Sequence, residues 1–187
     1  IIISDDGLQQ YAIERDVEIA VIDGDRRFGN GHSLPMGPLR EPEARLNSVD
    51  LLVVNGGHSV TNKETNMQLV CKKVYSLGHP DKTLELSYFT GHTVHAIAGI
   101  GYPERFFQQL RNLGIEVIPH AFPDHYQFSP ADISFADVLP VLMTEKDAVK
   151  CKHFAQAKHW VVAVTVELPV SFDESLLTLI KDIKHAR

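Results

Sequence analysis

The sequence has few cysteines and no long hydrophobic run. Its 187 residues include only two cysteines, Cys71 and Cys151, which lie far apart and form no CxxC motif. Two isolated cysteines are typical of a reducing compartment, although the sequence alone leaves a disulfide between them open. No apolar run of about 18 residues is present, and no signal peptide, so the sequence predicts no membrane-spanning helix.

The chain also lacks an excess of positive charge. It has 18 Lys and Arg against 24 Asp and Glu, a net charge of −6, and no basic stripe. This balance argues against a nucleic-acid partner. The ten histidines are scattered, without the spacing of metal ligands. Hydrophobic residues at 44% and charged residues at 22% are typical of a globular protein with one ordinary domain or two small ones.

A phosphate-binding glycine motif is missing as well. No GxxxxGK[ST] occurs in the chain. The segment Gly99–Glu104 offers only GxG, with Glu104 where a dinucleotide-binding motif has its third glycine. The sequence as given therefore contains no motif that would by itself cradle a phosphate.

Apolar runs do alternate with helical patterns along the chain. This alternation predicts an α/β fold with a mostly parallel sheet. In the last predicted helix, Ser171 is the expected cap and Glu174 completes a capping box. Residues 58–90 read as an irregular connector that contains one helix. The predicted strands are 1–3, 17–23, 49–55, 94–101, 115–118, 138–144 and 160–166; the predicted helices are 8–16, 42–47, 67–77, 103–113, a short one from 131, and 171–185.

The chain opens on three isoleucines followed by Asp5, Asp6 and Gly7. This pattern predicts a buried parallel strand that ends in two carboxylates, at the sheet edge where open α/β folds bind ligands. Two such carboxylates suit Mg²⁺ carried with nucleotide phosphates. The alternative is a turn that only caps the strand, because Asp-Gly is common turn chemistry. A core strand seldom opens an intact chain, so we expect the first half of the protein to be missing.

A long loop rich in glycine and proline follows the second predicted strand, over residues 24–42. Long loops inside compact domains are more often functional than idle. Glu41 comes at its end, at the start of a predicted helix. Glu41 either faces Asp5 and Asp6 as a further metal-site carboxylate or interacts only with the helix dipole.

Two further polar groups follow later strands. His125 lies beside Asp124 in a loop, where a histidine can relay protons or can simply be solvated. Lys146 follows the predicted strand 138–144, where it could meet a phosphate or form a surface pair with Asp147.

Taken together, several segments resemble the tetraacyldisaccharide 4′-kinase family, which phosphorylates the lipid A precursor. The order and spacing of the segments run through nearly the whole chain, with residues 58–90 the least familiar part. The segments are Asp5–Gln9, Asp23–Gly24, Phe28–Gly31, Leu34–Pro42, Ala98–Phe107, Phe122–His125 and Leu142–Lys150.

The resemblance implies a P-loop-NTPase-like three-layer sandwich whose N-terminal strands and P-loop precede Ile1. Residues 1–90 would belong to the kinase core and residues 91–187 to a smaller α/β region. The implied reaction moves the γ-phosphoryl group of ATP to the 4′-hydroxyl of tetraacyldisaccharide 1-phosphate. Asp5, Asp6 and Glu41 would handle Mg²⁺ and ATP, and Asp6 and His125 would be catalytic.

In the implied mechanism, His125 helps an aspartate upstream of Ile1 to activate the acceptor hydroxyl. The family's phosphate-binding lysine and the apolar segment that contacts the membrane also lie upstream. The resemblance thus implies a peripheral enzyme at the cytoplasmic face of the bacterial inner membrane, with this piece soluble. We expect the chain alone to have no measurable kinase activity, because the phosphate anchor is missing.

Two other functions stay open at this point. Val21–Asp25 gives a strand-end DxD like that of haloacid-dehalogenase phosphohydrolases, although Arg27 stands where that family expects Thr or Val. The chain could also be a non-catalytic or degenerate domain that binds a protein or an acylated sugar without turning it over.

Overall fold

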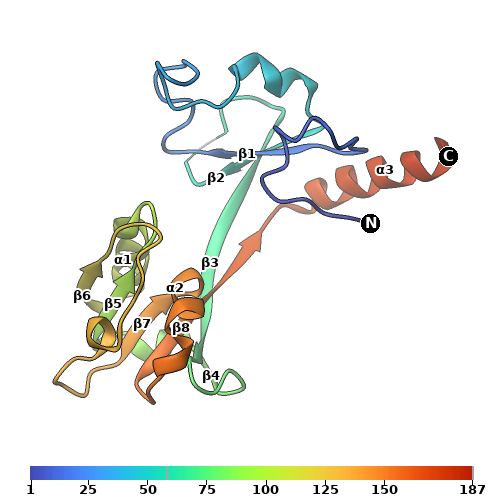
Figure 1. The fold of residues 1–187 in the computed structure, drawn as a ribbon. Helices are drawn as coiled ribbons and strands as arrows, with labels where there is room; N and C mark the ends of the chain where they lie inside the picture. The colour runs from blue at the N-terminus through green and yellow to red at the C-terminus, as the bar shows by residue number, and fades with distance from the viewer. Residues whose placement is uncertain (58, 187) are drawn as a thin grey trace. The chain divides into compact units, whose positions relative to one another are not determined.

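The computed structural model describes residues 1–57 and 59–186 of an α/β protein (Figure 1). Contacts within the chain group it into two compact units, one of residues 1–69 with 166–187 and one of residues 70–165. The expected division into a kinase core and a smaller region, with a boundary near residue 90, stays a prediction. Two long strands, β3 (Glu64–Ser76) and β8 (His159–Glu167), each pass from one unit into the other.

The first unit contains three parallel-paired strands. β1 (Ile19–Asp23) pairs with β2 (Leu51–Asn55), and β2 pairs with the first part of β3. The predicted strands at 17–23 and 49–55 are therefore confirmed. The predicted helix at 42–47 is a 3₁₀ helix, Glu43–Ser48.

The last helix, α3 (Val170–Ala186), also belongs to the first unit. Ser171 lies inside this helix rather than before it, so the predicted capping box is wrong. The Ser171 carbonyl accepts a hydrogen bond from the Ser175 hydroxyl instead, at 2.9 Å.

Three sequence-based predictions in the first 90 residues are wrong. Ile1–Ile3 form no strand and are 91% to 99% exposed, since no neighbouring strand of the described chain pairs with them. Residues 8–16 form turns rather than a helix. Residues 67–77 belong mostly to the long strand β3, because pairing with its neighbours outweighs the local helical pattern.

The second unit is built around β5 (Thr93–Ala98). β5 pairs in parallel with both β6 (Glu116–Ala121) and β7 (Val141–Thr144), and β7 pairs in parallel with β8. The strand order in this unit is β3-β8-β7-β5-β6, and the short β4 (Thr83–Glu85) pairs antiparallel to β3. The sheet is therefore mixed but mostly parallel. Its helices are α1 (Pro103–Asn112), α2 (Glu145–Cys151) and the 3₁₀ helices Leu86–Phe89, Pro130–Ile133 and Lys152–Phe154.

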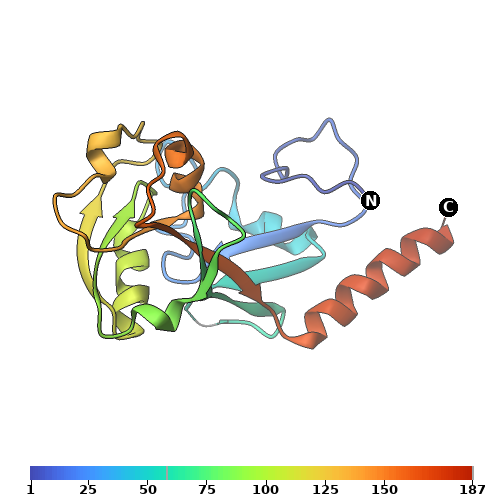
Figure 2. The same ribbon diagram turned by 90° about the horizontal axis from the view of Figure 1, so that it is seen from below.

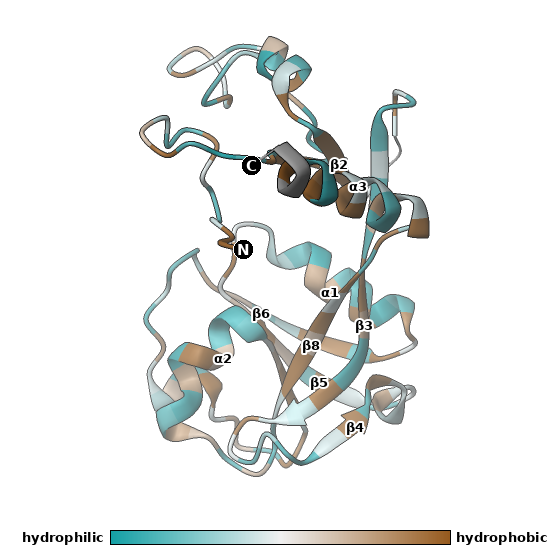
Figure 3. Ribbon diagram, turned by 90° about the vertical axis from the view of Figure 1, so that its right-hand side faces the viewer, coloured by the Kyte–Doolittle hydropathy of each residue, from teal (hydrophilic) through white to brown (hydrophobic). Residues whose placement is uncertain are grey.

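Helices cover both faces of this sheet. Val94, Ala96 and Ala98 of β5 pack in one apolar cluster with Phe107 and Leu110 of α1. Ile97 points to the other face, in a second cluster with Ala148 and Cys151 of α2. Figure 2 shows α1 and α2 on opposite sides of the strands, and Figure 3 shows the hydrophobic residues along β8. Because alternate residues of β5 are buried on opposite faces, the second unit has three layers.

Among residues 1–57 and 59–186, no helix is both long and apolar enough to cross a membrane.

Candidate functional site

Polar side chains gather where three parallel strands of the second unit end. Gly99 follows β5, the loop Phe122–His125 follows β6, and Lys146 follows β7 at the start of α2. Gly101 lies beside the β6 loop, because a Cβ placed on it would be 3.8 Å from Asp124 Oδ2. The carboxyl edge of a parallel sheet is the usual ligand site in open α/β folds.

Asp124 is the centre of this group. Its Oδ1 accepts hydrogen bonds from Lys146 Nζ at 2.8 Å and from the backbone amide of His125 at 3.0 Å. The hydrogen bond from Lys146 lowers the pKa of Asp124, and the His125 amide lowers it further. Asp124 therefore stays ionised at neutral pH. The sequence suggested that Lys146 pairs with Asp147, but its partner is Asp124.

His125 stands at the tip of the loop with its side chain 81% exposed. Its backbone has φ of 60°, in the left-handed region that residues other than glycine seldom adopt. Its Nε2 lies 3.8 Å from Asp124 Oδ2. The imidazole is thus accessible to a ligand at the strand ends, and its catalytic role stays a prediction.

An aromatic cluster supports the base of the same loop. The rings of Phe122, Tyr126 and Phe128 lie with their centroids 4.8 to 5.2 Å apart. Lys150 Nζ lies 5.6 Å from the centre of the Phe128 ring. These contacts fix both ends of the short segment that carries His125.

Asp147, which the sequence suggested as a surface partner of Lys146, is instead a fully buried carboxylate. Its Oδ2 accepts hydrogen bonds from the Gly99 amide at 2.9 Å and the Thr144 hydroxyl at 2.7 Å, and Lys150 Nζ lies 3.4 Å from Oδ1. Asp147 therefore joins the end of β5 to the start of α2. The pattern Thr144-x-x-Asp147 is a helix-start signal that could have identified both the helix and this residue.

The predicted metal-site residues lie in the first unit. Arg40 donates to both carboxylate oxygens of Asp6, at 2.8 and 2.9 Å, in an exposed ion pair. Glu41 accepts hydrogen bonds from Gln9 Nε2 at 2.9 Å and from the Tyr11 hydroxyl. The structure thus brings the N-terminal segment against Arg40 and Glu41, while Asp5 is exposed to solvent.

The donor set of this region has the chemistry that Mg²⁺ prefers. Its side chains are carboxylates, and protein sites for Mg²⁺ often use only one or two of them beside phosphates and water. Among the described residues, no group of three or more His, Cys, Asp or Glu side chains is placed to hold a metal ion. Asp5 and Asp6 also lie in a turn rather than at a strand end, so the strand argument for them is wrong. Their role as metal ligands, with Glu41, stays a prediction.

The glycine- and proline-rich loop that leads to Glu41 has a defined shape. Asn30 Nδ2 donates to the Met36 carbonyl at 2.9 Å, and its Oδ1 accepts from the His32 amide at 3.1 Å. Gly37 packs so closely that a Cβ would lie 2.1 Å from Asn30 Oδ1. This close approach explains why a glycine is needed at this point of the loop.

The DxD at the end of β1 is a turn in this structure. Asp23 Oδ1 accepts hydrogen bonds from the backbone amides of Asp25 and Arg26, at 3.0 and 3.1 Å. This is the capping role of an aspartate in a turn. The geometry therefore gives no separate support to the phosphohydrolase alternative.

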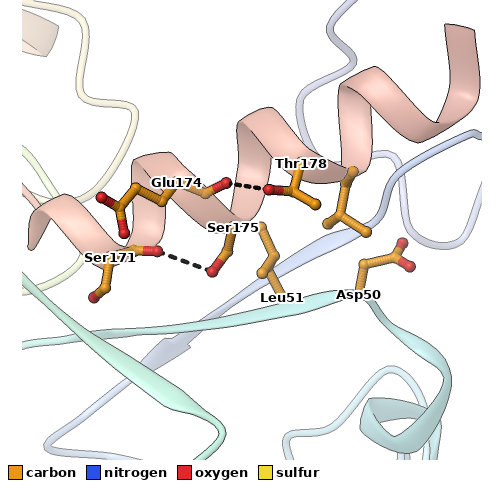
Figure 4. A pocket seen from close by; sticks show the side chains of 7 residues that line it. Asp50, Leu51, Ser171, Glu174, Ser175 and Thr178 are labelled. Atoms are coloured by element: carbon orange, nitrogen blue, oxygen red, sulfur yellow. Dashed lines mark hydrogen bonds between the residues drawn. The ribbon is translucent and has the colours of Figure 1, made fainter.

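A depression of about 480 Å³ lies between α3 and the start of β2 in the first unit (Figure 4). The hydroxyls of Ser175 and Thr178 on its wall donate to carbonyls of α3 itself, at 2.9 and 2.8 Å. Because these protons are used within the helix, the wall offers few donors to a ligand. The residues that line it are Asp50, Leu51, Ser171, Glu174, Ser175, Thr178 and Leu179.

Comparison with known proteins gives consistent matches. A family model described as Tetraacyldisaccharide-1-P 4′-kinase matches residues 1–181. The chain is 51% identical over 182 residues to the tetraacyldisaccharide 4′-kinase of Nitrosococcus oceani, covering 97% of the chain and 53% of the relative. It is 49% identical over 187 residues to that of Hahella chejuensis, covering 98% of the chain and 54% of the relative.

A solved structure matches as well. The crystal structure of "apo" form LpxK from Aquifex aeolicus in complex with ATP superposes with a TM-score of 0.74 at 26% sequence identity. The match covers 95% of this chain and 56% of that one. The chain therefore spans about half the length of the relatives it matches.

Proposed function

Because the chain belongs to the tetraacyldisaccharide-1-P 4′-kinase family, we propose that its protein transfers the γ-phosphoryl group of ATP to the 4′-hydroxyl of tetraacyldisaccharide 1-phosphate. The observation that carries the proposal is the match of the family model to residues 1–181. Two tetraacyldisaccharide 4′-kinases with 51% and 49% sequence identity to the chain support it. The reaction would serve lipid A synthesis at the cytoplasmic face of the bacterial inner membrane, with the protein peripheral to the membrane.

The fold and the bound ligand of the solved relative support this proposal. That relative is in complex with ATP, and its fold matches nearly all of this chain. We place the chain in a P-loop-NTPase-like three-layer sandwich, in which a phosphate loop outside this sequence would complete the nucleotide site. The covered faces of the β5–β8 sheet agree with such layering.

The proposed chemistry assigns His125 to the acceptor. Its exposed imidazole stands at the carboxyl edge of parallel strands, where it can take up or hold the proton of the 4′-hydroxyl. A carboxylate outside this chain would work with it. Asp124 stays ionised beside the imidazole, with its Oδ2 3.8 Å from His125 Nε2.

In the same proposal, Asp5, Asp6 and Glu41 hold Mg²⁺ with the nucleotide. When bound, the ion would neutralise negative charge on the phosphates of the nucleotide. The protein's own part is to present oxygen ligands. Asp6 must exchange its bonds to Arg40 for this role, and Glu41 is oriented by Gln9 and Tyr11.

Single substitutions in the full-length protein test the two assignments separately. We expect His125→Ala to lower kcat by about a hundredfold or more, since a positioned acid or base is worth that much. Asp6→Ala should also lower kcat strongly, since phosphoryl transfer depends on charge neutralisation by the metal. His153→Ala and Asp81→Ala, two exposed positions, serve as matched controls and should keep the normal rate. Near wild-type kcat in His125→Ala and Asp6→Ala would show that the site is assigned wrongly. ATP-dependent turnover by residues 1–187 alone would contradict the need for an external phosphate loop.

A further inference from the structure

We propose that Asp124 and Lys146 form a positioning clamp that holds His125 in place for phosphoryl transfer. The inference rests on the proposed function, in which His125 meets the acceptor hydroxyl. It adds two residues, from different elements, that act through His125 and need not touch the substrate.

Within the clamp, Asp124 contacts the backbone of His125 and lies close to its imidazole ring. Asp124 Oδ1 accepts the backbone N–H of His125 at 3.0 Å, while Oδ2 lies 3.8 Å from His125 Nε2. His125 has φ of 60°, a conformation that surrounding contacts must maintain in a residue other than glycine. The bond from the Tyr126 amide to the Pro123 carbonyl, at 3.2 Å, closes the turn around His125. Asp124 lies inside this turn, and Lys146 holds its carboxylate against the His125 amide.

Lys146 fixes the carboxylate from a second element. Its Nζ donates to Asp124 Oδ1 at 2.8 Å, across 22 residues of sequence. Lys146 is the second residue of α2, whose start is capped by Thr144 Oγ1, the acceptor of the Asp147 amide at 3.2 Å. Asp147 in turn binds the Gly99 amide at the end of β5. The loop after β6 is thus tied, through Lys146, to the ends of β7 and β5.

The ion pair between Lys146 and Asp124 should affect the position of His125 more than the stability of the fold. The side chains of Lys146 and Asp124 are 47% and 41% exposed, and exposed ion pairs contribute little to folding. Breaking the pair should therefore leave the protein folded. A displacement of about 1 Å at a reacting group, in contrast, can lower a rate by about a hundredfold. The expected effect is accordingly on kcat.

The test uses the full-length enzyme with the variants Lys146→Met, Lys146→Arg and Asp124→Asn. We expect Lys146→Met and Asp124→Asn to lower kcat by about ten- to a hundredfold, with an unchanged KM for ATP and an unchanged unfolding temperature. Lys146→Arg, which can remake the ion pair, should recover most of the rate. Lys152→Met, an exposed lysine just beyond α2, is the matched control and should keep the normal kcat.

A double-mutant cycle then asks whether the clamp acts through His125. In the His125→Ala background, adding Asp124→Asn or Lys146→Met should lower kcat no further. A further loss there, or no recovery in Lys146→Arg, would overturn the clamp. If His125→Ala is impaired but Asp124→Asn and Lys146→Met are normal, the clamp fails and the proposed function stands. If His125→Ala itself keeps the normal rate, the assignment of His125 fails first.

Discussion

The buried carboxylate of Asp147 offers the sharpest test of how this fold holds its strand ends. Asp147 is 0% exposed and accepts from the Gly99 amide and the Thr144 hydroxyl. Lys150, whose side chain is only 20% exposed, lies 3.4 Å away. Replacing Asp147 should therefore lower the free energy of unfolding. The loss should be larger the more buried polar groups the substitution leaves without a hydrogen-bond partner.

Two substitutions separate the loss of charge from the loss of the group. Asp147→Ala leaves the Gly99 amide and the Lys150 ammonium without their partner, and breaking a buried pair costs about 3–5 kcal/mol. Asp147→Asn keeps the volume and one acceptor oxygen but loses the charge. It should cost about 1.5–3 kcal/mol, the value of hydrogen bonds to a charged group.

Hydrogen exchange on the full-length protein measures these losses locally. Peptides that cover 93–99 and 141–148 should exchange roughly a hundredfold to several thousandfold faster in Asp147→Ala, with Asp147→Asn in between. Asp81→Asn, an exposed aspartate of the same unit, should stay within about 0.5 kcal/mol of the wild type. If exchange in Asp147→Ala stayed within about threefold of the wild type, the reasoning from burial would be refuted.

Two further predictions concern buried titratable groups of the second unit. Burial lowers the pKa of His159, whose Nδ1 accepts from the Gln156 amide and whose Nε2 donates to the Ile133 carbonyl. The unfolded chain therefore binds the proton more readily, and stability should fall as the pH drops below about 6.5, by up to about 2 kcal/mol at pH 5. His159→Gln should lose less stability than the wild type between pH 7.5 and 5, and an equal loss would contradict this. Burial raises the pKa of Cys151 to about 12, so iodoacetamide should label the half-buried Cys71 well before Cys151, as mass spectrometry can follow.

Local patterns predicted the parts of the fold that local interactions decide. The helix after Pro103 begins and ends close to where it was expected, and Phe106, Phe107 and Leu110 form its buried face. Gly114 follows it with φ of 74°, the left-handed position that favours glycine after a helix. In each case the deciding contacts lie within a few residues of one another.

The wrong predictions concern segments whose structure depends on distant partners. Residues 67–77 have apolar spacing that fits a helix, yet most of them belong to β3, which pairs with β2, β4 and β8. Ile1–Ile3 read as a core strand, but an apolar run becomes a strand only where a neighbour supplies hydrogen bonds. Sequence patterns alone carry no information about such neighbours.

The candidate site shows the same limit. The sequence places Asp124 beside His125, so that contact could be anticipated. The hydrogen bond from Lys146 to Asp124 could not be predicted from the sequence. It forms only because β6 and β7 flank β5 and their carboxyl ends lie at one edge of the sheet. The burial of Asp147 was also not anticipated, since its partner Gly99 is 48 residues away.

The bond between Arg40 and Asp6 bears on the proposed metal role. Both side chains are more than 60% exposed, and such pairs are screened by salt and hold weakly. A divalent ion delivered with a nucleotide would bring twice the positive charge of the guanidinium and direct oxygen coordination. Asp6 can therefore leave Arg40 at little cost, and the observed pair does not oppose metal binding. If Asp6 binds the ion as proposed, Arg40 is released close to the nucleotide, so Arg40→Met should raise the KM for ATP, whereas a purely structural pair would leave that KM unchanged.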